Sequence, residues 1–179
     1  MVFEPIHSQP VYSGRAFEVR QDELRLPNGR TTVLDIVYHA GSVAILPIDQ
    51  EGRVWFVRQY RHAAGHSLLE LPAGVLEADE TPEAGARREI REETGMAAGK
   101  LKKIGAFYLA PGYSTELMVV FLASHLQPAP LPGDEDEFLS VEKITLPQVF
   151  KMAYAGEILD SKTLALLMLA RPFLKSQGI

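Results

Sequence analysis

The chain has 179 residues, 46% of them hydrophobic, which suits one globular domain or one domain with a small appendage. It has no cysteine, which excludes disulfides, thiolate metal sites and a cysteine nucleophile. Its formal charge of −5 argues against a nucleic-acid polymer as partner, because a phosphate backbone is bound by clustered lysine and arginine. No stretch reaches the roughly 18 apolar residues of a membrane span and the N-terminus does not read as a secretion signal, so we expect a soluble, cytoplasmic protein with a small-molecule partner.

The first 40 residues predict a small β unit in front of the main domain. Polar and apolar residues alternate over residues 11–20 and again over 31–38, as in half-buried strands. Asn28-Gly29, between these two stretches, is a strong hairpin-turn signal. We therefore divide the chain into an N-terminal β unit, residues 1–40, and a main domain, residues 41–179.

The main domain begins with strands and changes to helix at Thr81. Two apolar strands are predicted at 42–48 and 54–59, on either side of a turn-forming Asp-Gln-Glu-Gly sequence. Thr81 suits an N-cap, Pro82 the first helical position and Gly95 a C-terminal cap, so a helix is predicted between them. The remaining predicted elements are strands at 101–109 and 116–123, a proline-rich acidic loop at 128–137, a strand at 138–145 and helices at 146–155 and 161–174. This order predicts the α+β class, with helices flanking a mixed sheet.

Three glutamates near the end of the predicted helix are its most informative feature. Glu89, Glu92 and Glu93 are three and four residues apart, so a helix places their carboxylates on one face. Like charges at this spacing repel, and the last turn of a helix disfavours anions. Arg88 offsets one charge, and a divalent cation would offset the rest, because carboxylate oxygens are the ligands that Mg²⁺ prefers. The alternative is a solvated charged face without a ligand.

The residues around these glutamates favour the metal site. They follow the pattern Gly, five residues, Glu, seven residues, Arg-Glu, an aliphatic residue, any residue, Glu-Glu, any residue, Gly and an aliphatic residue. The nine defined positions are Gly74, Glu80, Arg88, Glu89, Ile90, Glu92, Glu93, Gly95 and Met96. This pattern is the Nudix box, and the chain therefore resembles the Nudix hydrolases. The resemblance implies a mixed β sheet sandwiched between helices (α/β/α) and metal-dependent hydrolysis of nucleoside diphosphates linked to a further group.

The resemblance also implies roles for residues of the box. The residues that would hold Mg²⁺, or Mn²⁺ in its place, are Ala73 through its backbone carbonyl, Glu89, Glu92 and Glu93. Glu92 and Glu93 are also expected to be catalytic, with Glu92 a ligand or a water-organising group. Gly74 would let the backbone approach the metal site closely. Glu80 and Arg88 would brace the loop and the helix through an ion pair.

Within the family, the chain resembles the ADP-ribose pyrophosphatase branch. Pro111 lies 16 residues after Gly95, the offset that marks this branch, although Ala110 stands where the branch normally has serine. The branch implies ADP-ribose as substrate, AMP and ribose 5-phosphate as products, and a glutamate of the acidic loop as general base. Glu135 and Glu137 are the candidates for the base, and we favour Glu135.

Four more residues are expected to contact the substrate. Arg61 is a candidate for a bidentate phosphate contact, with a surface ion pair as its alternative, and Glu116 for a hydrogen bond to a ribose hydroxyl. Gly112 belongs to the loop that contains the branch-specific proline. Phe17, or Tyr12 in its place, is a candidate to stack on adenine, with core packing as the alternative for both.

The resemblance also leads to expectations about the oligomeric state and the substrate. The N-terminal strands commonly exchange between two subunits in this branch, so the resemblance implies a homodimer with residues 1–40 as the dimerisation element. The substrate alternatives are GDP-mannose, another nucleotide sugar, NADH or a dinucleoside polyphosphate, because loops outside the box recognise the distal group. A sensor that binds ADP-ribose without hydrolysing it is the alternative from another class. The intact box argues against the sensor.

Overall fold

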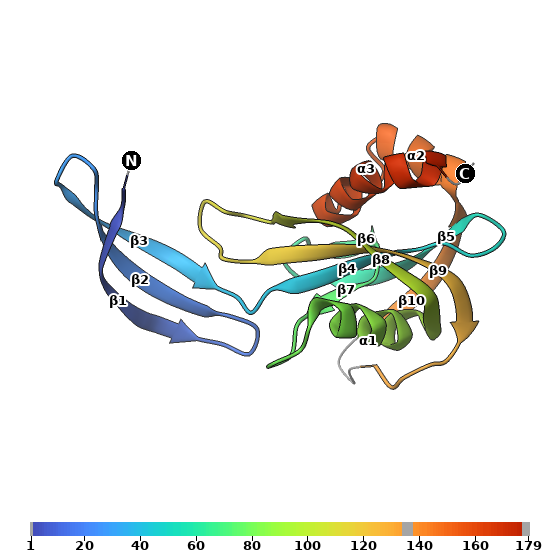
Figure 1. Ribbon diagram of the computed structural model, residues 1–179, viewed down its shortest axis with the longest axis horizontal. Coiled ribbons are helices and arrows are strands. Elements are labelled where there is room, and N and C mark those ends of the chain that lie inside the picture. Colours follow the sequence, from blue (N-terminus) through green and yellow to red (C-terminus); the bar gives the residue numbers. More distant parts are fainter. Residues whose placement is uncertain (1, 134–137, 177–179) are drawn as a thin grey trace.

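The computed structural model describes residues 2–133 and 138–176, and within these ranges the strands form three sheets (Figure 1). The strands are β1 (Glu4–Ser13), β2 (Glu18–Arg25), β3 (Thr31–Tyr38), β4 (Ser42–Pro47), β5 (Arg53–Arg61), β6 (His66–Glu70), β7 (Ala73–Val75), β8 (Met96–Tyr108), β9 (Leu117–Pro128) and β10 (Leu139–Thr145). The helices are α1 (Pro82–Thr94), α2 (Leu146–Tyr154) and α3 (Ser161–Ser176). No helix in the described ranges is long and apolar enough to cross a membrane.

The N-terminal unit is an antiparallel sheet of β1, β2 and β3 that projects from the rest of the molecule (Figure 1). The single strand predicted over residues 11–20 is wrong, because β1 and β2 are joined by a turn in which the Gly14 amide donates to the Phe17 carbonyl at 3.0 Å. The alternation of polar and apolar residues continues through this turn, so the pattern by itself does not show where one strand ends and the next begins. The Asn28-Gly29 turn is confirmed, and Gly29 has the positive φ of 83° that this turn requires.

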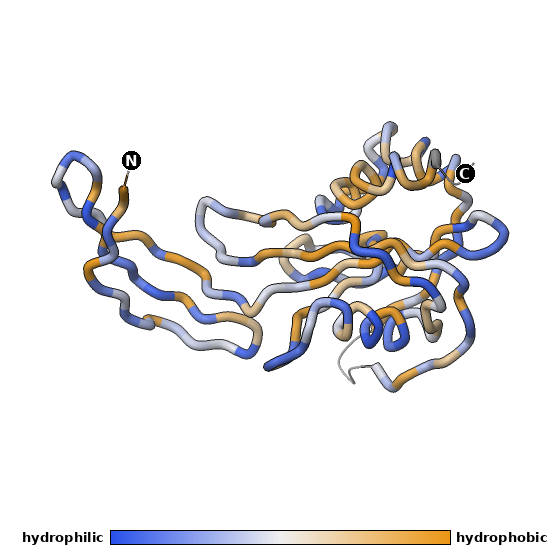
Figure 2. Tube along the Cα trace, in the orientation of Figure 1, coloured by the Kyte–Doolittle hydropathy of each residue, from blue (hydrophilic) through white to orange (hydrophobic). Residues whose placement is uncertain are grey.

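The main domain is built on a mixed sheet of order β7-β4-β9-β8, in which β4 and β9 are parallel. These two central strands are buried on both faces, and Figure 2 shows them as an apolar band through the centre of the domain. One face packs on α1, through Val43, Ile45, Val119, Phe121, Ala86 and Ile90. The other face packs on α2, α3 and the second sheet, through Ala44, Leu46, Val120, Phe56, Val149 and Leu166. The predicted α+β class and α/β/α arrangement are confirmed.

The second sheet, of order β10-β5-β6, and the short strand β7 complete the core. Neither β6 nor β7 was predicted, because both are short and Pro72 interrupts the segment between them. β7 pairs with β4 through the partners Val43 and Gly74. This pairing places Gly74 directly beside α1.

Helix α1 has the predicted boundaries. The Thr81 hydroxyl accepts a hydrogen bond from the Ala84 amide at 3.3 Å, as an N-cap does. Gly95 closes the helix with φ 73°, and its amide donates to the Arg91 carbonyl at 3.0 Å. Glu89 and Glu93, on the face turned toward the sheet, are buried, at 8% and 4% exposure. Two of the three carboxylates predicted to form a metal site therefore lie inside the domain, and the third, that of Glu92, is partly exposed.

Candidate active site

A cavity of about 750 Å³ opens where α1, β7 and the ends of β4, β5 and β9 meet. Its walls are Arg15, Ala16, Ser42, Gln59, Arg61, Ala73, Gly74, Val75, Glu77, Arg88, Glu89, Glu92, Leu109, Glu116, Met118 and Lys162. The predicted site residues that line it are Arg61, Ala73, Glu89, Glu92 and Glu116. Glu93 lies next to this group, because its carboxylate accepts a hydrogen bond from the Ala73 amide at 3.1 Å. The fold thus brings together residues from positions 61 to 116.

Gly74 provides the space in which the Glu89 carboxylate lies. A Cβ atom built on Gly74 would overlap both oxygens of that carboxylate. The backbone at Gly74 therefore approaches the Glu89 carboxylate more closely than any residue with a Cβ would allow. The backbone of β7 and the side chain of Glu89 form one wall of the cavity together.

Arg88 holds the acidic residues of the box in place. Its guanidinium donates to Glu80 at 2.9 and 3.0 Å, to Glu89 at 2.7 Å and to Glu92 at 2.9 Å. The hydrogen bonds to Glu80, above all, raise the pKa of Arg88, and the same bonds lower the pKa of Glu80. The predicted ion pair between Glu80 and Arg88 is confirmed.

The described residues contain no group of three acidic or histidine side chains already arranged around a metal position. Protein groups hold these carboxylates: Arg88 bonds Glu89 and Glu92, and the Ala73 amide bonds Glu93. The donor set still fits a hard divalent cation, since it offers several carboxylates beside a backbone that approaches closely at Gly74.

A second charged cluster contributes cations to the same cavity. Arg61 donates to both carboxylate oxygens of Glu70 at 2.8 Å, and Lys162 pairs with Glu70 and with Asp160. Burial by itself would raise the pKa of Glu70, but the hydrogen bonds from Arg61 and Lys162 outweigh burial and lower it. Glu70 thus engages one of the two edges through which Arg61 could bind a phosphate bidentately, the edge formed by Nε and Nη2.

Lys162 is a cavity residue to which the sequence assigned no role. Asp160 fixes it, because this carboxylate bonds Lys162 at 3.0 Å and accepts from the amide and hydroxyl of Thr163 at 3.0 and 2.6 Å. The buried Thr163 hydroxyl in turn accepts from the Leu71 amide at 2.9 Å. No local pattern marked Lys162, because its partner Glu70 lies 92 residues away in the sequence.

Glu116 reaches the cavity from the loop between β8 and β9. The Ser42 hydroxyl donates to Glu116 Oε1 at 2.7 Å. The same loop is joined to the N-terminal unit, because the Val37 amide donates to the Tyr113 carbonyl at 2.7 Å and the Thr115 amide to the Val37 carbonyl at 2.9 Å. Gly112 is exposed in this loop and does not line the cavity.

The N-terminal unit also reaches the cavity, though not through the predicted aromatic residue. Phe17 is 42% exposed, lies 6.2 Å from the Tyr12 ring and does not line the cavity. The neighbouring turn residues Arg15 and Ala16 do line it. The sequence pattern did not predict a role for these two residues, because their position at the cavity depends on how the turn between β1 and β2 is placed against the main domain. Glu135 and Glu137 lie outside the described residues.

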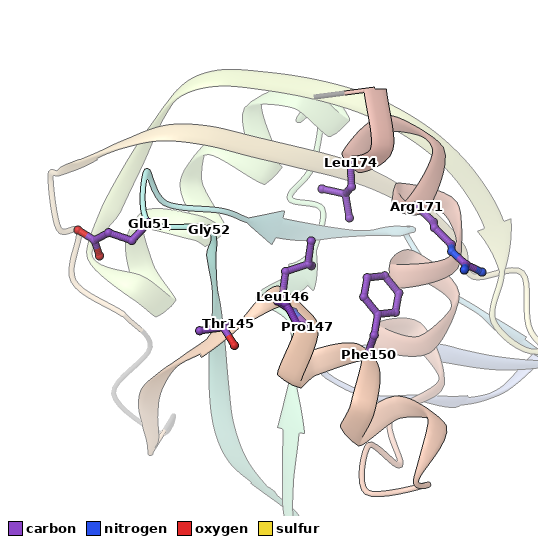
Figure 3. Close-up of a pocket in the computed structure, with 8 residues that line it drawn as sticks. All are labelled: Glu51, Gly52, Thr145, Leu146, Pro147, Phe150, Arg171 and Leu174. Carbon is purple, nitrogen blue, oxygen red and sulfur yellow. The ribbon is translucent and has the colours of Figure 1, made fainter. Parts of the chain in front are cut away.

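A second cavity, of about 500 Å³, lies between the β4–β5 turn and helices α2 and α3 (Figure 3). Leu146, Phe150 and Leu174 supply apolar walls, and Figure 3 shows the Arg171 guanidinium directed away from them. None of the predicted site residues lines it. The larger cavity is therefore the candidate active site.

Comparison with known proteins identifies the family of the chain. The family model of the NUDIX domain matches residues 38–167. The chain belongs to the Nudix family. This Nudix hydrolase is 40% identical over 160 residues to the ADP-ribose pyrophosphatase of Bacillus subtilis (strain 168), covering 88% of this chain and 86% of that protein. It is 38% identical over 136 residues to the GDP-mannose pyrophosphatase of Citrobacter koseri, covering 71% of each chain. A solved structure described as "Crystal structure of ADP compounds hydrolase" superimposes with a TM-score of 0.86 at 26% identity, covering 98% of this chain and 96% of that one.

Proposed function

We propose that this Nudix hydrolase cleaves the diphosphate of ADP-ribose, with water as co-substrate, and releases AMP and ribose 5-phosphate. The observation that carries the proposal is the charge distribution of one cavity. The carboxylates of Glu89 and Glu92 and the cations Arg61 and Lys162 line the same space. A substrate diphosphate accompanied by a divalent cation is complementary to both sets of groups. The named activity of the B. subtilis relative supports ADP-ribose in particular.

The cofactor in this proposal is Mg²⁺, with Mn²⁺ as a substitute. Glu89, Glu92 and Glu93 would hold it, together with the Ala73 carbonyl. When bound, the metal neutralises the diphosphate and lowers the pKa of the attacking water. The close backbone approach at Gly74 supports this donor set, because a larger residue would displace the Glu89 carboxylate. Arg88 keeps Glu89 and Glu92 in position before the metal binds.

The base in this proposal is a glutamate of the acidic loop, Glu135 or Glu137, with Glu135 favoured. The described residues that precede this segment in the sequence lie beside the last turn of α1. The Leu131 amide donates to the Arg91 carbonyl at 3.4 Å. A Cβ built on Gly133 would lie 3.7 Å from the Glu92 carbonyl oxygen. Changing each glutamate to glutamine separates them, since loss of the base lowers kcat and leaves metal affinity unchanged.

The remaining assignments concern residues that would contact the phosphate oxygens, the ribose and the adenine of ADP-ribose. Arg61 and Lys162 would contact phosphate oxygens, with Arg61 using the nitrogen that Glu70 leaves unbonded. Glu116 would accept a hydrogen bond from a ribose hydroxyl. Phe17 remains a candidate for the adenine and Gly112 for the substrate in general, although neither lines the cavity, and Arg15, which does line it, joins them.

We also propose a homodimer that acts in the cytoplasm, with residues 1–40 as the dimerisation element. All ten residues of β1 are exposed. Large apolar side chains are among the exposed residues of this unit: Val2, Phe3, Ile6, Val11, Tyr12, Val33 and Leu34. Exposed apolar area of this kind is stabilised when another subunit covers it. Sedimentation equilibrium of the full chain tests the dimer, and a monomer mass would refute it.

Product analysis tests the proposed reaction. Purified protein with ADP-ribose and Mg²⁺ is expected to yield AMP and ribose 5-phosphate, and Glu93→Gln is expected to abolish both products. GDP-mannose is the second candidate substrate, because the C. koseri relative carries that activity in its name. Comparing kcat/KM for ADP-ribose, GDP-mannose, NADH and a dinucleoside polyphosphate ranks the alternatives. Binding of ADP-ribose without any product would instead indicate a sensor.

A further inference from the structure

We propose that Ser42 is a positioning residue for Glu116, and that the pair makes the enzyme selective for substrates that carry a ribose hydroxyl at the Glu116 carboxylate. The inference rests on the proposed hydrolysis of a nucleoside diphosphate sugar and deepens it. Ser42 lies outside the Nudix box, and no role was predicted for it from the sequence.

Ser42 is held rigidly at the edge of the cavity. It is the first residue of β4, where it pairs with Val75 of β7 on one side and with Met118 of β9 on the other. Only 3% of its surface is exposed, although its side chain lines the cavity. A strand fixed on both edges fixes the direction of its side chains. The Ser42 hydroxyl is therefore a fixed point against which a neighbouring side chain can be oriented.

Glu116 has a fixed backbone but a longer, rotatable side chain. Its amide donates to the Ser114 hydroxyl at 3.2 Å, and its carbonyl accepts from the Leu109 amide at 3.2 Å. The hydrogen bond from Ser42 to Oε1, at 2.7 Å, restrains the side-chain torsions that these contacts leave open. A carboxylate restrained at one oxygen presents the other oxygen in a defined direction.

The consequence is selectivity. A site that is built to hydrogen-bond a substrate hydroxyl discriminates against an analogue without it, because the acceptor, here the partly buried Glu116, then loses that partner. Pre-orientation by Ser42 removes the cost of ordering Glu116 when the substrate binds. Because a ribose hydroxyl is remote from the reacting phosphorus, loss of this orientation should raise KM and leave kcat unchanged.

The test is a double-mutant cycle with Ser42→Ala, Glu116→Ala and the double variant, using ADP-ribose and analogues that each lack one ribose hydroxyl. Ser42→Ala is expected to raise KM for ADP-ribose about tenfold, the loss of one modest hydrogen bond, with kcat within about twofold. Ser42→Thr, which keeps a donor hydroxyl, should restore most of the affinity. In the Glu116→Ala background, Ser42→Ala should add nothing, because its effect passes through Glu116.

Ser124→Ala is the matched control, since this serine lies on β9, outside the cavity, and its hydroxyl bonds His125. The inference is overturned if Ser42→Ala raises KM equally with and without Glu116, or equally for every deoxy analogue and for ADP-ribose. Turnover by the wild type decides the proposed function separately. If another nucleoside diphosphate sugar is the substrate, the same cycle is run with that compound and its deoxy forms.

Discussion

Replacing Gly74 with alanine separates the geometry of the metal site from the stability of the fold. The new Cβ would overlap the Glu89 carboxylate, so the carboxylate must move by on the order of 1 Å. The obstacle is the far end of a flexible side chain, so the fold can yield at the cost of the 2.7 Å bond between Arg88 and Glu89. Losing one charge-assisted hydrogen bond costs about 1.5–3 kcal/mol of unfolding free energy. A catalytic group misplaced by about 1 Å costs roughly 10²-fold in rate.

The assay measures kcat for ADP-ribose against Mg²⁺ concentration, together with urea unfolding of the same samples. Gly74→Ala is expected to lower kcat about 10²-fold and to raise the Mg²⁺ concentration needed for half-maximal rate. Gly156→Ala is the control for the loss of a glycine as such, because Gly156 lies after α2 with open space around it and, unlike Gly74, has a positive φ of 74°. It should cost about 1 kcal/mol of stability through backbone strain and leave kcat unchanged. Wild-type metal dependence in Gly74→Ala would refute the argument that Gly74 shapes the site for Glu89.

Three further outcomes follow from the contacts of the cavity. Arg88→Met should destabilise the protein by about 3 kcal/mol in urea unfolding, because the largely buried carboxylates of Glu80, Glu89 and Glu92 lose the cation that they share. A loss of less than about 1 kcal/mol would contradict this account. Saturating Mg²⁺ should raise the Tm of the wild type and leave that of a Glu89→Gln, Glu93→Gln double variant unchanged, and an equal rise in both proteins would place the metal elsewhere. Because its folded pKa is lowered, the Glu70 carboxylate contributes stability that is fully present above its ordinary pKa of about 4.3 and lost as the pH falls through the lowered value. The difference in unfolding free energy between wild type and Glu70→Gln should therefore be constant near neutral pH and shrink below about pH 4.3, and a difference independent of pH would refute the ion-pair account.

The sequence determined the features that depend on neighbouring residues. The cap at Thr81, the left-handed Gly95 and the pairing of Arg88 with Glu92 all lie within a single helix, where spacing fixes geometry. The spacing of the box likewise placed Gly74 before that helix. The predicted strand over residues 11–20 failed for the same local reason, because a turn that preserves alternation leaves no mark in the pattern.

Only the tertiary structure decided what surrounds the box. Arg61 and Lys162 meet at Glu70 because β5 and β6 pair and the first turn of α3 lies at the end of β6, although Lys162 is 92 residues away from Glu70. Ser42 meets Glu116 across 74 residues because β4 and β9 are parallel neighbours. Such contacts depend on which strands pair and in what register, and no local pattern carries that information. The sequence by itself therefore specified Arg61 and the carboxylates proposed to bind a metal, whereas the fold brought Lys162 to the same cavity and placed the Ser42 hydroxyl beside Glu116.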